Sequence, residues 1–135
     1  MKIYLAMSAK AQEEGKRRRE QLREIGHEVT SRWLDVDIIP VPDITMGTRP
    51  MLWGHALADM QDIRHCDLFV IDSTTPSTTG GYHVEFGWAM GLDKNCVLIG
   101  PMLNIFHTLA AVQIYDSWEA FTEALLNGKL EMRWG

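Results

Sequence analysis

The sequence has only two cysteines, no long hydrophobic run and no excess of basic residues. Two thiols in 135 residues cannot build a disulfide framework, so we expect Cys66 and Cys96 to be reduced and buried beside apolar strands. No apolar run approaches the roughly 20 residues of a membrane span, and the first residues form a strand pattern instead of a signal sequence. These absences predict a cytoplasmic protein that binds no membrane.

Acidic residues outnumber basic ones by 18 to 13, which gives a formal net charge of −5. A nucleic-acid polymer requires a basic face, so the charge balance argues against such a partner. The one basic cluster, at residues 16–19, lies within a run that mixes acidic and basic residues. We expect this cluster to be the solvated face of a helix.

Several motifs of cofactor and phosphate binding are missing. No G-x-G-x-x-G follows the first predicted strand, and the sequence has neither a G-K-[ST] phosphate loop nor a G-x-S-x-G nucleophile elbow. The five histidines show no H-x-x-x-H spacing, and the cysteines lack the C-x-x-C spacing of zinc sites. We therefore expect neither a cofactor nor a metal ion.

Short apolar segments alternate with helical patterns along the chain. This alternation predicts βαβ units, a parallel sheet and right-handed crossovers. The expected fold is α/β: a single domain over residues 1–135, with three layers in a doubly wound arrangement and a five-stranded parallel sheet, as in flavodoxin-like and Rossmann-like proteins. The predicted strands are residues 2–7, 27–33, 68–71, 96–99 and 112–115, and the predicted helices cover about 10–25, 52–65, 81–91 and 116–128.

Two segments do not fit this alternation. Residues 34–50 contain three prolines and three aspartates, and irregular segments of this length are usually either functional lids or disordered. Residues 102–111 are expected to form a loop or a short helix. In the C-terminal tail, Trp134 is a candidate for docking on a partner subunit.

The most informative stretch runs from residue 66 to residue 92. The apolar run 68–71 is followed by Asp72, a loop rich in serine, threonine and glycine, and a helix that begins near Gly81. Ligands of open parallel sheets bind outside the carboxyl ends of the strands, and a helix N-terminus offers unpaired N–H groups. Asp72 and Glu85 are therefore placed where an α/β protein keeps its chemistry.

Glu85 has two interpretations. A glutamate held near a tyrosine of the neighbouring first strand, Tyr4, makes a covalent nucleophile, and a second carboxylate such as Asp59 then acts as acid or base. Alternatively, Glu85 only complements the positive end of its helix. Spacing alone gives the two interpretations equal weight.

Three segments together resemble the nucleoside 2-deoxyribosyltransferase superfamily, which includes nucleoside 5′-monophosphate N-glycosidases related to hydroxymethyl-dUMP hydrolase. They are K-I-Y-L-A at 2–6, A-D-M-Q-D-I-R-H-C-D at 58–67 and G-G-Y-H-V-E-F-G-W-A at 80–89. The resemblance extends in order and spacing over nearly the whole domain. It implies cleavage of the N-glycosidic bond of a nucleoside or nucleoside 5′-monophosphate, commonly 2′-deoxy, with transfer of the sugar to another base or to water. It also implies a homodimer or higher homo-oligomer.

The resemblance implies a role for each candidate residue. Glu85 looks like the nucleophile that attacks C1′, Tyr4 like the residue that holds and tunes it, and Asp59 like the carboxylate that contacts the sugar or protonates the departing base. The other candidates would bind the substrate: Ser77 at a 5′-phosphate, Gly80 and Gly81 by letting the backbone approach the ligand, and Ser8, Lys10 and Asp72 around them. Trp33, Trp53 and Trp88 are candidates for stacking on the base, although each also suits a core position.

The chain departs from the family pattern after the first strand. Ser8-Ala9-Lys10 stands in place of the S-x-R-G loop of the monophosphate-specific branch, so Lys10 would replace an arginine. The transferases take an asparagine from a neighbouring subunit, for which Asn127 is the candidate here, and residues 104–107 are a second candidate for reaching a neighbour's site. Hydrolysis or transfer, and the need for a 5′-phosphate, stay open. The 35–50 loop is expected to set the choice of base.

A different function class is also compatible with the sequence. A non-catalytic module on the same fold would bind or sense a nucleotide without cleaving it, and a purely structural protein is a third alternative. The position of three side chains separates the first two interpretations, because an acid and a nucleophile must meet at one sugar. Tyr4, Asp59 and Glu85 should converge in an enzyme and lie more than about 10 Å apart in a module that only binds.

Overall fold

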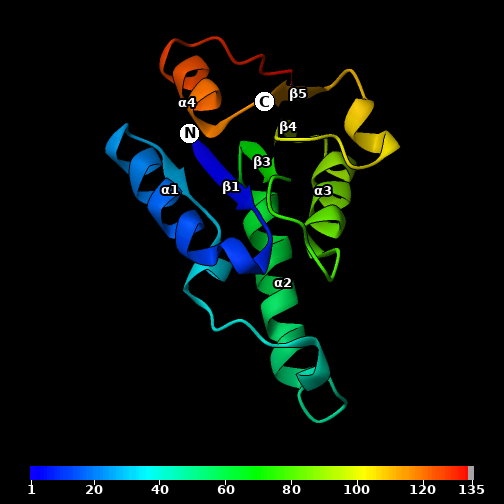
Figure 1. The fold of residues 1–135 in the computed structure, drawn as a ribbon. Helices are drawn as coiled ribbons and strands as arrows, with labels where there is room; N and C mark the ends of the chain where they lie inside the picture. Colours follow the sequence, from blue (N-terminus) through cyan, green and yellow to red (C-terminus); the bar gives the residue numbers. More distant parts are fainter. Residues whose placement is uncertain (134–135) are drawn as a thin grey trace.

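The computed structural model describes residues 1–133, and these residues contain one five-stranded parallel sheet (Figure 1). Its strands, in spatial order, run β2-β1-β3-β4-β5, and every neighbouring pair is parallel. The predicted α/β fold with its five-stranded parallel sheet is therefore confirmed. The strands are β1 (Lys2–Ala6), β2 (Glu28–Val29), β3 (Leu68–Asp72), β4 (Asn95–Ile99) and β5 (Val112–Tyr115).

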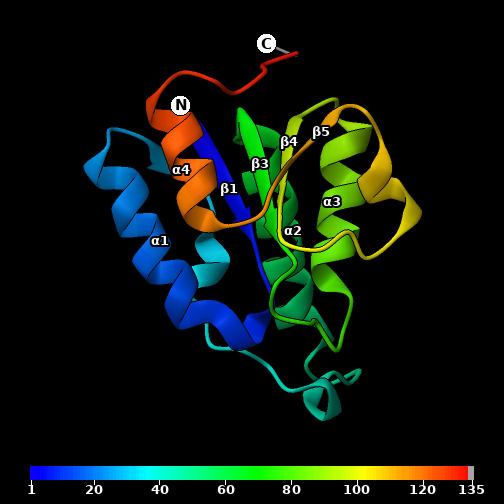
Figure 2. The same cartoon turned by 45° about the horizontal axis from the view of Figure 1, so that its top comes forward.

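Helices cover both faces of the sheet. Figures 1 and 2 show α1 and α4 on one face and α2 and α3 on the other. Ser117 caps the last helix, because its hydroxyl accepts a hydrogen bond from the N–H of Ala120 at 3.1 Å. Gly26, which follows α1, has a φ of +94°, a conformation that favours glycine at a helix end. The four helices are α1 (Gln12–Glu24), α2 (Arg49–His65), α3 (Gly81–Gly91) and α4 (Trp118–Leu126).

Side chains of β1 and β3 alternate between two apolar layers, as the two-residue period of a strand requires. Tyr4, Phe69 and Ile71 belong to the layer beneath α2 and α3. Ile3 and Val70 belong to the layer beneath α1 and α4. Because both faces are covered, these strands appear in the sequence as continuous apolar runs.

The second strand is shorter than predicted, because β2 ends at Val29 and not at Trp33. Beyond that point, two side chains take over the hydrogen bonds of β1. The N–H of Leu5 donates to Ser31 Oγ at 2.7 Å, and the indole Nε1 of Trp33 donates to the Leu5 carbonyl at 2.8 Å. The chain turns into a short 3₁₀ helix, η2 (Arg32–Asp35), which places Trp33 at the carboxyl edge of the sheet.

Residues 36–48, called the lid below, connect η2 to α2 and contain one 3₁₀ turn, η3 (Val41–Asp43). The irregular segment predicted at 34–50 is therefore bounded by η2 and by the start of α2 at Arg49. Figure 1 shows the lid and the first turns of α2 extending away from the sheet. Apolar side chains of the lid remain exposed there, Met46 by 76%.

The basic cluster at residues 16–19 is not the fully solvated face that was expected. Arg18 lies 4.8 Å from the ring centroid of Trp118 on α4 and pairs with Asp72 at the end of β3. Arg19 pairs with Asp35 at 2.8 Å. Because these two long side chains cover apolar surface between α1 and its neighbours, only 13% and 12% of their area is exposed.

Cys66 and Cys96 are buried and unpaired, as expected. Burial raises the pKa of both thiols to about 12. The segment 102–111 contains a short 3₁₀ helix, η4 (Ile105–Thr108), in agreement with the prediction. Trp134 lies outside the described residues. Within residues 1–133 no helix has the length and apolar character needed to cross a membrane.

Candidate active site

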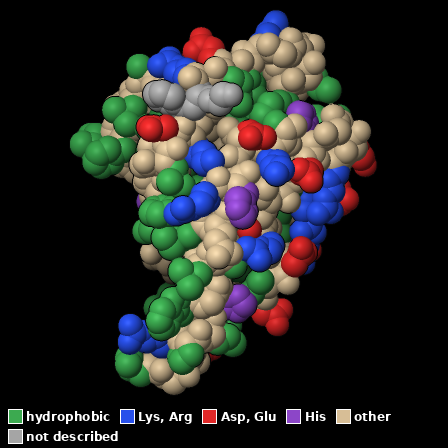
Figure 3. All heavy atoms as spheres, turned by 180° about the vertical axis from the view of Figure 1, so that it is seen from behind, with side chains coloured by type: hydrophobic (Ala, Val, Ile, Leu, Met, Phe, Trp, Pro, Cys, Tyr) green, Lys and Arg blue, Asp and Glu red, His purple; other side chains and the backbone are tan. Residues whose placement is uncertain are grey.

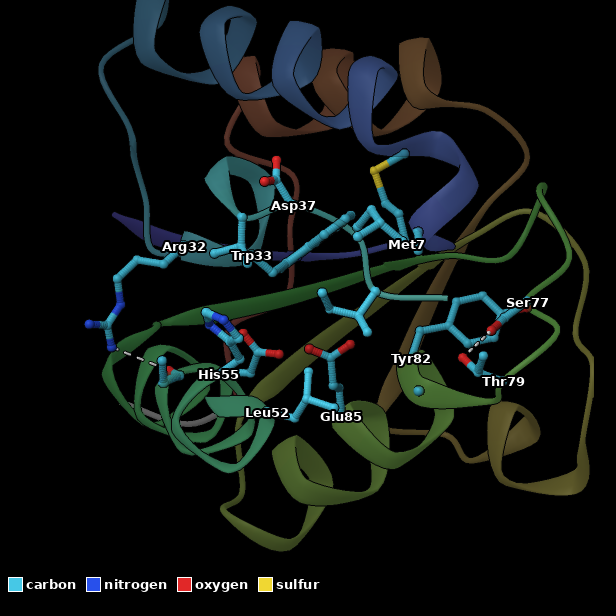
Figure 4. Close-up of a pocket in the computed structure, with 17 residues that line it drawn as sticks. Met7, Arg32, Trp33, Asp37, Leu52, His55, Ser77, Thr79, Tyr82 and Glu85 are labelled. Atoms are coloured by element: carbon cyan, nitrogen blue, oxygen red, sulfur yellow. Dashed lines mark hydrogen bonds between the residues drawn. The ribbon is translucent and has the colours of Figure 1, made fainter. Parts of the chain in front are cut away.

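A pocket lies at the carboxyl end of the sheet, where β1 and β3 run side by side. The chain leaves β1 toward β2 on one side, and β3 continues toward β4 on the other, so this is the point at which the strand order reverses. Open α/β sheets bind their ligands at such a switch point. The pocket lining comes from η2, the lid, α2 and the segment that leads into α3 (Figure 4).

Tyr4 and Glu85 form the centre of the site. The Tyr4 hydroxyl donates a hydrogen bond to Glu85 Oε2. The Tyr4 side chain is completely buried, and its ring stacks on Phe69 with the centroids 5.5 Å apart and the planes 6° apart. The phenol is therefore held rigidly by β1 and β3, while α3 supplies the carboxylate that lines the pocket.

Asp59 reaches the same pocket from α2. Three residues further along this helix, Asp62 is buried and accepts three hydrogen bonds from Arg32, one from the backbone N–H at 3.0 Å and two from Nε at 2.9 and 3.1 Å. The Thr30 hydroxyl adds a bond to the Asp62 carbonyl at 2.9 Å. The segment after β2 is thus fastened to α2 beside Asp59.

The surroundings of Asp59 and Glu85, two of the carboxyl groups that line the pocket, favour their neutral forms to different extents. Burial raises the pKa of Glu85 to about 8; the hydrogen bond from Tyr4 opposes this rise, and the charge of Asp59 adds to it. Burial and the charge of Asp62 raise the pKa of Asp59 to about 6, against the influence of His55 and Arg32. Burial and the two pocket carboxylates raise the pKa of Tyr4 well above its ordinary value. Carboxyls with separated pKa values are typical of acid–base sites.

One end of the pocket carries hydroxyl groups and a helix N-terminus. Ser77 and Thr79 line it, and Ser77 Oγ accepts a hydrogen bond from the Gly80 N–H at 3.1 Å. Gly80 precedes α3 with a φ of +74°, so its conformation requires a glycine. A Cβ on Gly81 would meet only Thr79 Oγ1, at 3.7 Å. Gly80 is therefore needed for its backbone angle, and neither glycine is needed to relieve crowding within the protein.

The opposite end of the pocket is aromatic and apolar. Figure 4 shows Trp33 and His55 on one side of Glu85, with Ser77 and Thr79 on the other. The hydrogen bond from Trp33 to Leu5 fixes the indole ring at this end. Lid side chains complete the aromatic end, together with Leu52 from α2.

Four of the predicted substrate-binding residues lie outside the pocket lining: Ser8, Lys10, Asp72 and Gly80. Ser8 is buried, and its Oγ accepts a hydrogen bond from the Lys10 N–H at 3.3 Å. Lys10 is exposed. Asp72 lies on the opposite face of the sheet, as its place in the alternation of β3 requires, where it pairs with Arg18 and accepts two hydrogen bonds from Thr74.

The three tryptophans considered for stacking on the base lie in different environments. Trp33 lines the pocket, whereas Trp88 packs against the core and lines an adjacent groove between α2 and α3. Trp53 is 60% exposed, so the core position considered for it is wrong. Asn127 lies exposed at the end of α4, away from the pocket lining.

The structure adds pocket residues that the sequence did not single out: Arg32, Asp37, His55 and Thr79. A signal existed for His55, because it precedes Asp59 by one helical turn and so shares its face of α2. No comparable signal existed for Arg32 and Asp37, which reach the site only because β2 ends early. Within residues 1–133, no group of three or more His, Cys, Asp or Glu side chains is arranged to hold a metal ion.

Comparison with known proteins gives a result at the level of structure. No protein-family model and no curated protein matches the sequence. A CMP N-glycosidase from Clostridium botulinum matches with a TM-score of 0.57 and 22% identity, over 93% of this chain and 98% of that one. A 2-deoxyribosyltransferase from Bacillus psychrosaccharolyticus matches with a TM-score of 0.66 and 20% identity, over 93% of this chain and 96% of that one. The chain therefore has, over nearly its whole length, the fold of a 2-deoxyribosyltransferase and of a CMP N-glycosidase.

Proposed function

We propose that the chain belongs to the nucleoside 2-deoxyribosyltransferase superfamily and cleaves the N-glycosidic bond of a nucleoside or nucleoside 5′-monophosphate, with Glu85 as nucleophile. The observation that carries this proposal is the hydrogen bond from buried Tyr4 to Glu85 in a pocket that Asp59 also lines. Convergence of the three side chains favours an enzyme over a module that only binds. A CMP N-glycosidase and a 2-deoxyribosyltransferase have the same fold, and the reaction proposed here is of the same kind.

The chemistry follows from the charge that develops on the sugar. As the bond from C1′ to the base stretches, C1′ gains oxocarbenium character, and a carboxylate on that face stabilises it and then bonds to it. Glu85 performs this step in its ionised form, which the Tyr4 hydroxyl stabilises by hydrogen bonding. Asp59 adds a second carboxylate beside the same sugar. The glycosyl ester on Glu85 is then released to water or to a second base.

The two ends of the pocket orient the substrate. With C1′ at Glu85, the sugar 5′ group lies toward Ser77, Thr79 and the start of α3, which offer hydroxyls and N–H donors. The base then lies toward Trp33, whose ring can stack on it.

The charges of the pocket lining affect whether the substrate can carry a phosphate on its 5′ group. The lining contains three carboxylates, Asp37, Asp59 and Glu85, and one arginine, Arg32, whose guanidinium is engaged by Asp62. A 5′-phosphate dianion would therefore meet no unpaired lysine or arginine among the described lining residues. We expect unphosphorylated nucleosides to be the better substrates.

We propose further that the chain acts as a homo-oligomer. Figure 3 shows hydrophobic side chains along one edge of the molecule, from the side of η4 down to the lid. Val84 on α3 is 74% exposed and Phe106 on η4 is 59% exposed, and both line one groove between these elements. Apolar patches of this kind mark association surfaces. Val84→Glu should shift the molecular mass measured by light scattering toward that of one chain, and an unchanged mass would contradict this interface.

The experiment that tests the activity uses a panel of 2′-deoxynucleosides, ribonucleosides and their 5′-monophosphates, each with and without a second free base. Released base and new nucleosides are separated by chromatography, so hydrolysis and transfer are both visible. Glu85→Gln should abolish base release, while Glu123→Gln, an exposed site on α4, should leave it unchanged. Binding without any base release would instead support the non-catalytic module.

A further inference from the structure

His55 is a pocket residue to which the proposed chemistry has not yet given a role. It lines the pocket at the aromatic end, and Figure 4 shows its ring on the same side of Glu85 as Trp33. Its imidazole forms no hydrogen bond with any side chain or backbone group of residues 1–133. Both ring nitrogens are therefore available to a ligand.

The geometry of α2 sets the distance of His55 from the reacting centre. Residues one turn apart on a helix lie about 5–6 Å from each other on the same face. Asp59 stands beside Glu85, and His55 lies one turn further from it, toward Leu52 and the lid. If the sugar occupies the level of Asp59 and Glu85, the base attached to C1′ reaches the level of His55.

His55 and Asp59 also interact electrostatically. The interaction between them acts against the rise of the Asp59 pKa that burial and Asp62 cause. Both side chains line the pocket from the same face of α2, one turn apart, so they can act on one ligand together.

We propose that His55 is the catalytic acid that contacts the nucleobase and donates the proton on which its departure depends. This inference rests on the proposed N-glycosidic function and adds a residue to it. Asp59 then acts as the carboxylate that supports His55 and the sugar.

The proton and electron balance of this step is complete. The bond between C1′ and the base nitrogen breaks, and its electron pair stays with the base, which takes the proton of the His55 imidazolium. A Glu85 oxygen forms the new bond to C1′. In the second step water, or the N–H of an incoming base, attacks C1′ and returns a proton to His55, while Glu85 leaves as the carboxylate.

A leaving-group series in the intact protein tests this assignment. His55→Gln keeps a polar, helix-compatible side chain but cannot act as an acid. The matched control is His65→Gln, an exposed histidine at the end of the same helix, outside the pocket. Each variant is assayed on a substrate that the wild type cleaves and on its activated analogue: an N7-methylated purine nucleoside, or a pyrimidine nucleoside with an electron-withdrawing 5-substituent. Such bases leave with little or no need for a proton.

We expect His55→Gln to lower kcat on the ordinary substrate by about 100-fold or more, and on the activated analogue by less than about tenfold. His65→Gln should match the wild type on both. His55→Asn, a second variant without an acid, should repeat the pattern and guards against a folding defect in the first.

Four other results would overturn the assignment. An equal loss on both substrates indicates a structural role, and a change confined to KM indicates recognition of the base without proton donation. Wild-type rates in both variants leave His55 without a role while the proposed function stands. If the wild type itself releases no base from any substrate, the proposed function fails, and the role of His55 fails with it.

Discussion

Tyr4 on β1 donates a hydrogen bond to Glu85 on α3, across 81 residues of sequence. The bond opposes the effect of burial, which favours the neutral carboxyl. Tyr4→Phe removes it with little change in volume, so the pKa of Glu85 should rise above about 8 and less of the nucleophile should be ionised at pH 7. We expect kcat/KM at pH 7 to fall by roughly tenfold, which corresponds to about one pKa unit. Tyr115→Phe, in the other core layer, is the control.

The two pocket carboxyls should titrate at different pH values. Carbon-13 NMR of labelled carboxyls should show Asp59 titrating near pH 6 and Glu85 near pH 8 in the free protein. Because the charge of Asp59 contributes to the rise at Glu85, Asp59→Asn should move the Glu85 titration to lower pH, although burial keeps its pKa above 4.5. A Glu85 carboxyl that titrates near 4.5 would contradict the buried environment described here.

Glu85 should reduce the stability of the fold at alkaline pH. Its folded pKa of about 8 exceeds the ordinary value of 4.5, so the folded chain holds a proton that the unfolded chain releases. The stability that the folded chain gains from holding this proton is therefore fully present below pH 4.5, and it is lost as the pH rises through 8. Glu85→Gln carries no charge at either pH. It should increase the free energy of unfolding by about 1–3 kcal/mol at pH 8 and change it little at pH 4.5, as measured by urea denaturation.

Two adjacent glycines should respond differently to the same substitution. Gly80→Ala forces an alanine into the left-handed region, where φ is +74°, and should cost about 1 kcal/mol of stability. Gly80 leads from the Ser77 loop into α3, so the KM of the Gly80→Ala variant for its substrate should rise as well. Gly81→Ala meets only an ordinary contact within the protein, so it should leave stability unchanged. Equal effects at the two positions would show that φ is not the deciding property.

The ion pair between Arg18 and Asp72 should contribute more to stability than the other charges of α1. Arg18→Gln leaves the nearly buried Asp72 carboxylate without its cation, and loss of one partner of a buried pair costs about 3 kcal/mol or more. Arg17→Gln removes a charge that is 67% exposed and should cost less than about 1 kcal/mol. Denaturation of both variants, with Asp72→Asn added to complete a double-mutant cycle, measures the difference.

Most of the sheet could be predicted from sequence because its central strands are covered on both faces. Residues 2–6 and 68–72 are almost wholly apolar, which identifies them without knowledge of their neighbours. The second strand was too long in the prediction, since the alternation of polar and apolar residues continues to Trp33. Only the fold shows that Ser31 and Trp33 use their side chains, and not their backbone, to bind β1.

The candidate site could be predicted only in part from the sequence. Asp72 ends β3 and Glu85 follows it in the sequence, but the alternation of that strand turns Asp72 toward α1, where Arg18 binds it. Sequence spacing cannot reveal this pair, because nothing local shows that α1 lies beside the end of β3. The pocket positions of Arg32 and Asp37 could not be predicted for the same reason, because they depend on the path of the chain after β2.

The site is built from β1, α2 and α3, and this construction constrains how the protein can fold. Tyr4 and Glu85 are distant in sequence, so their contact requires closure of a long loop and belongs to the slow, non-local part of folding. An intermediate in which β1 has not yet paired with β3 would leave the Glu85 carboxyl exposed to water and free to ionise. Protonation of this one side chain should therefore report when the chain has completed its topology.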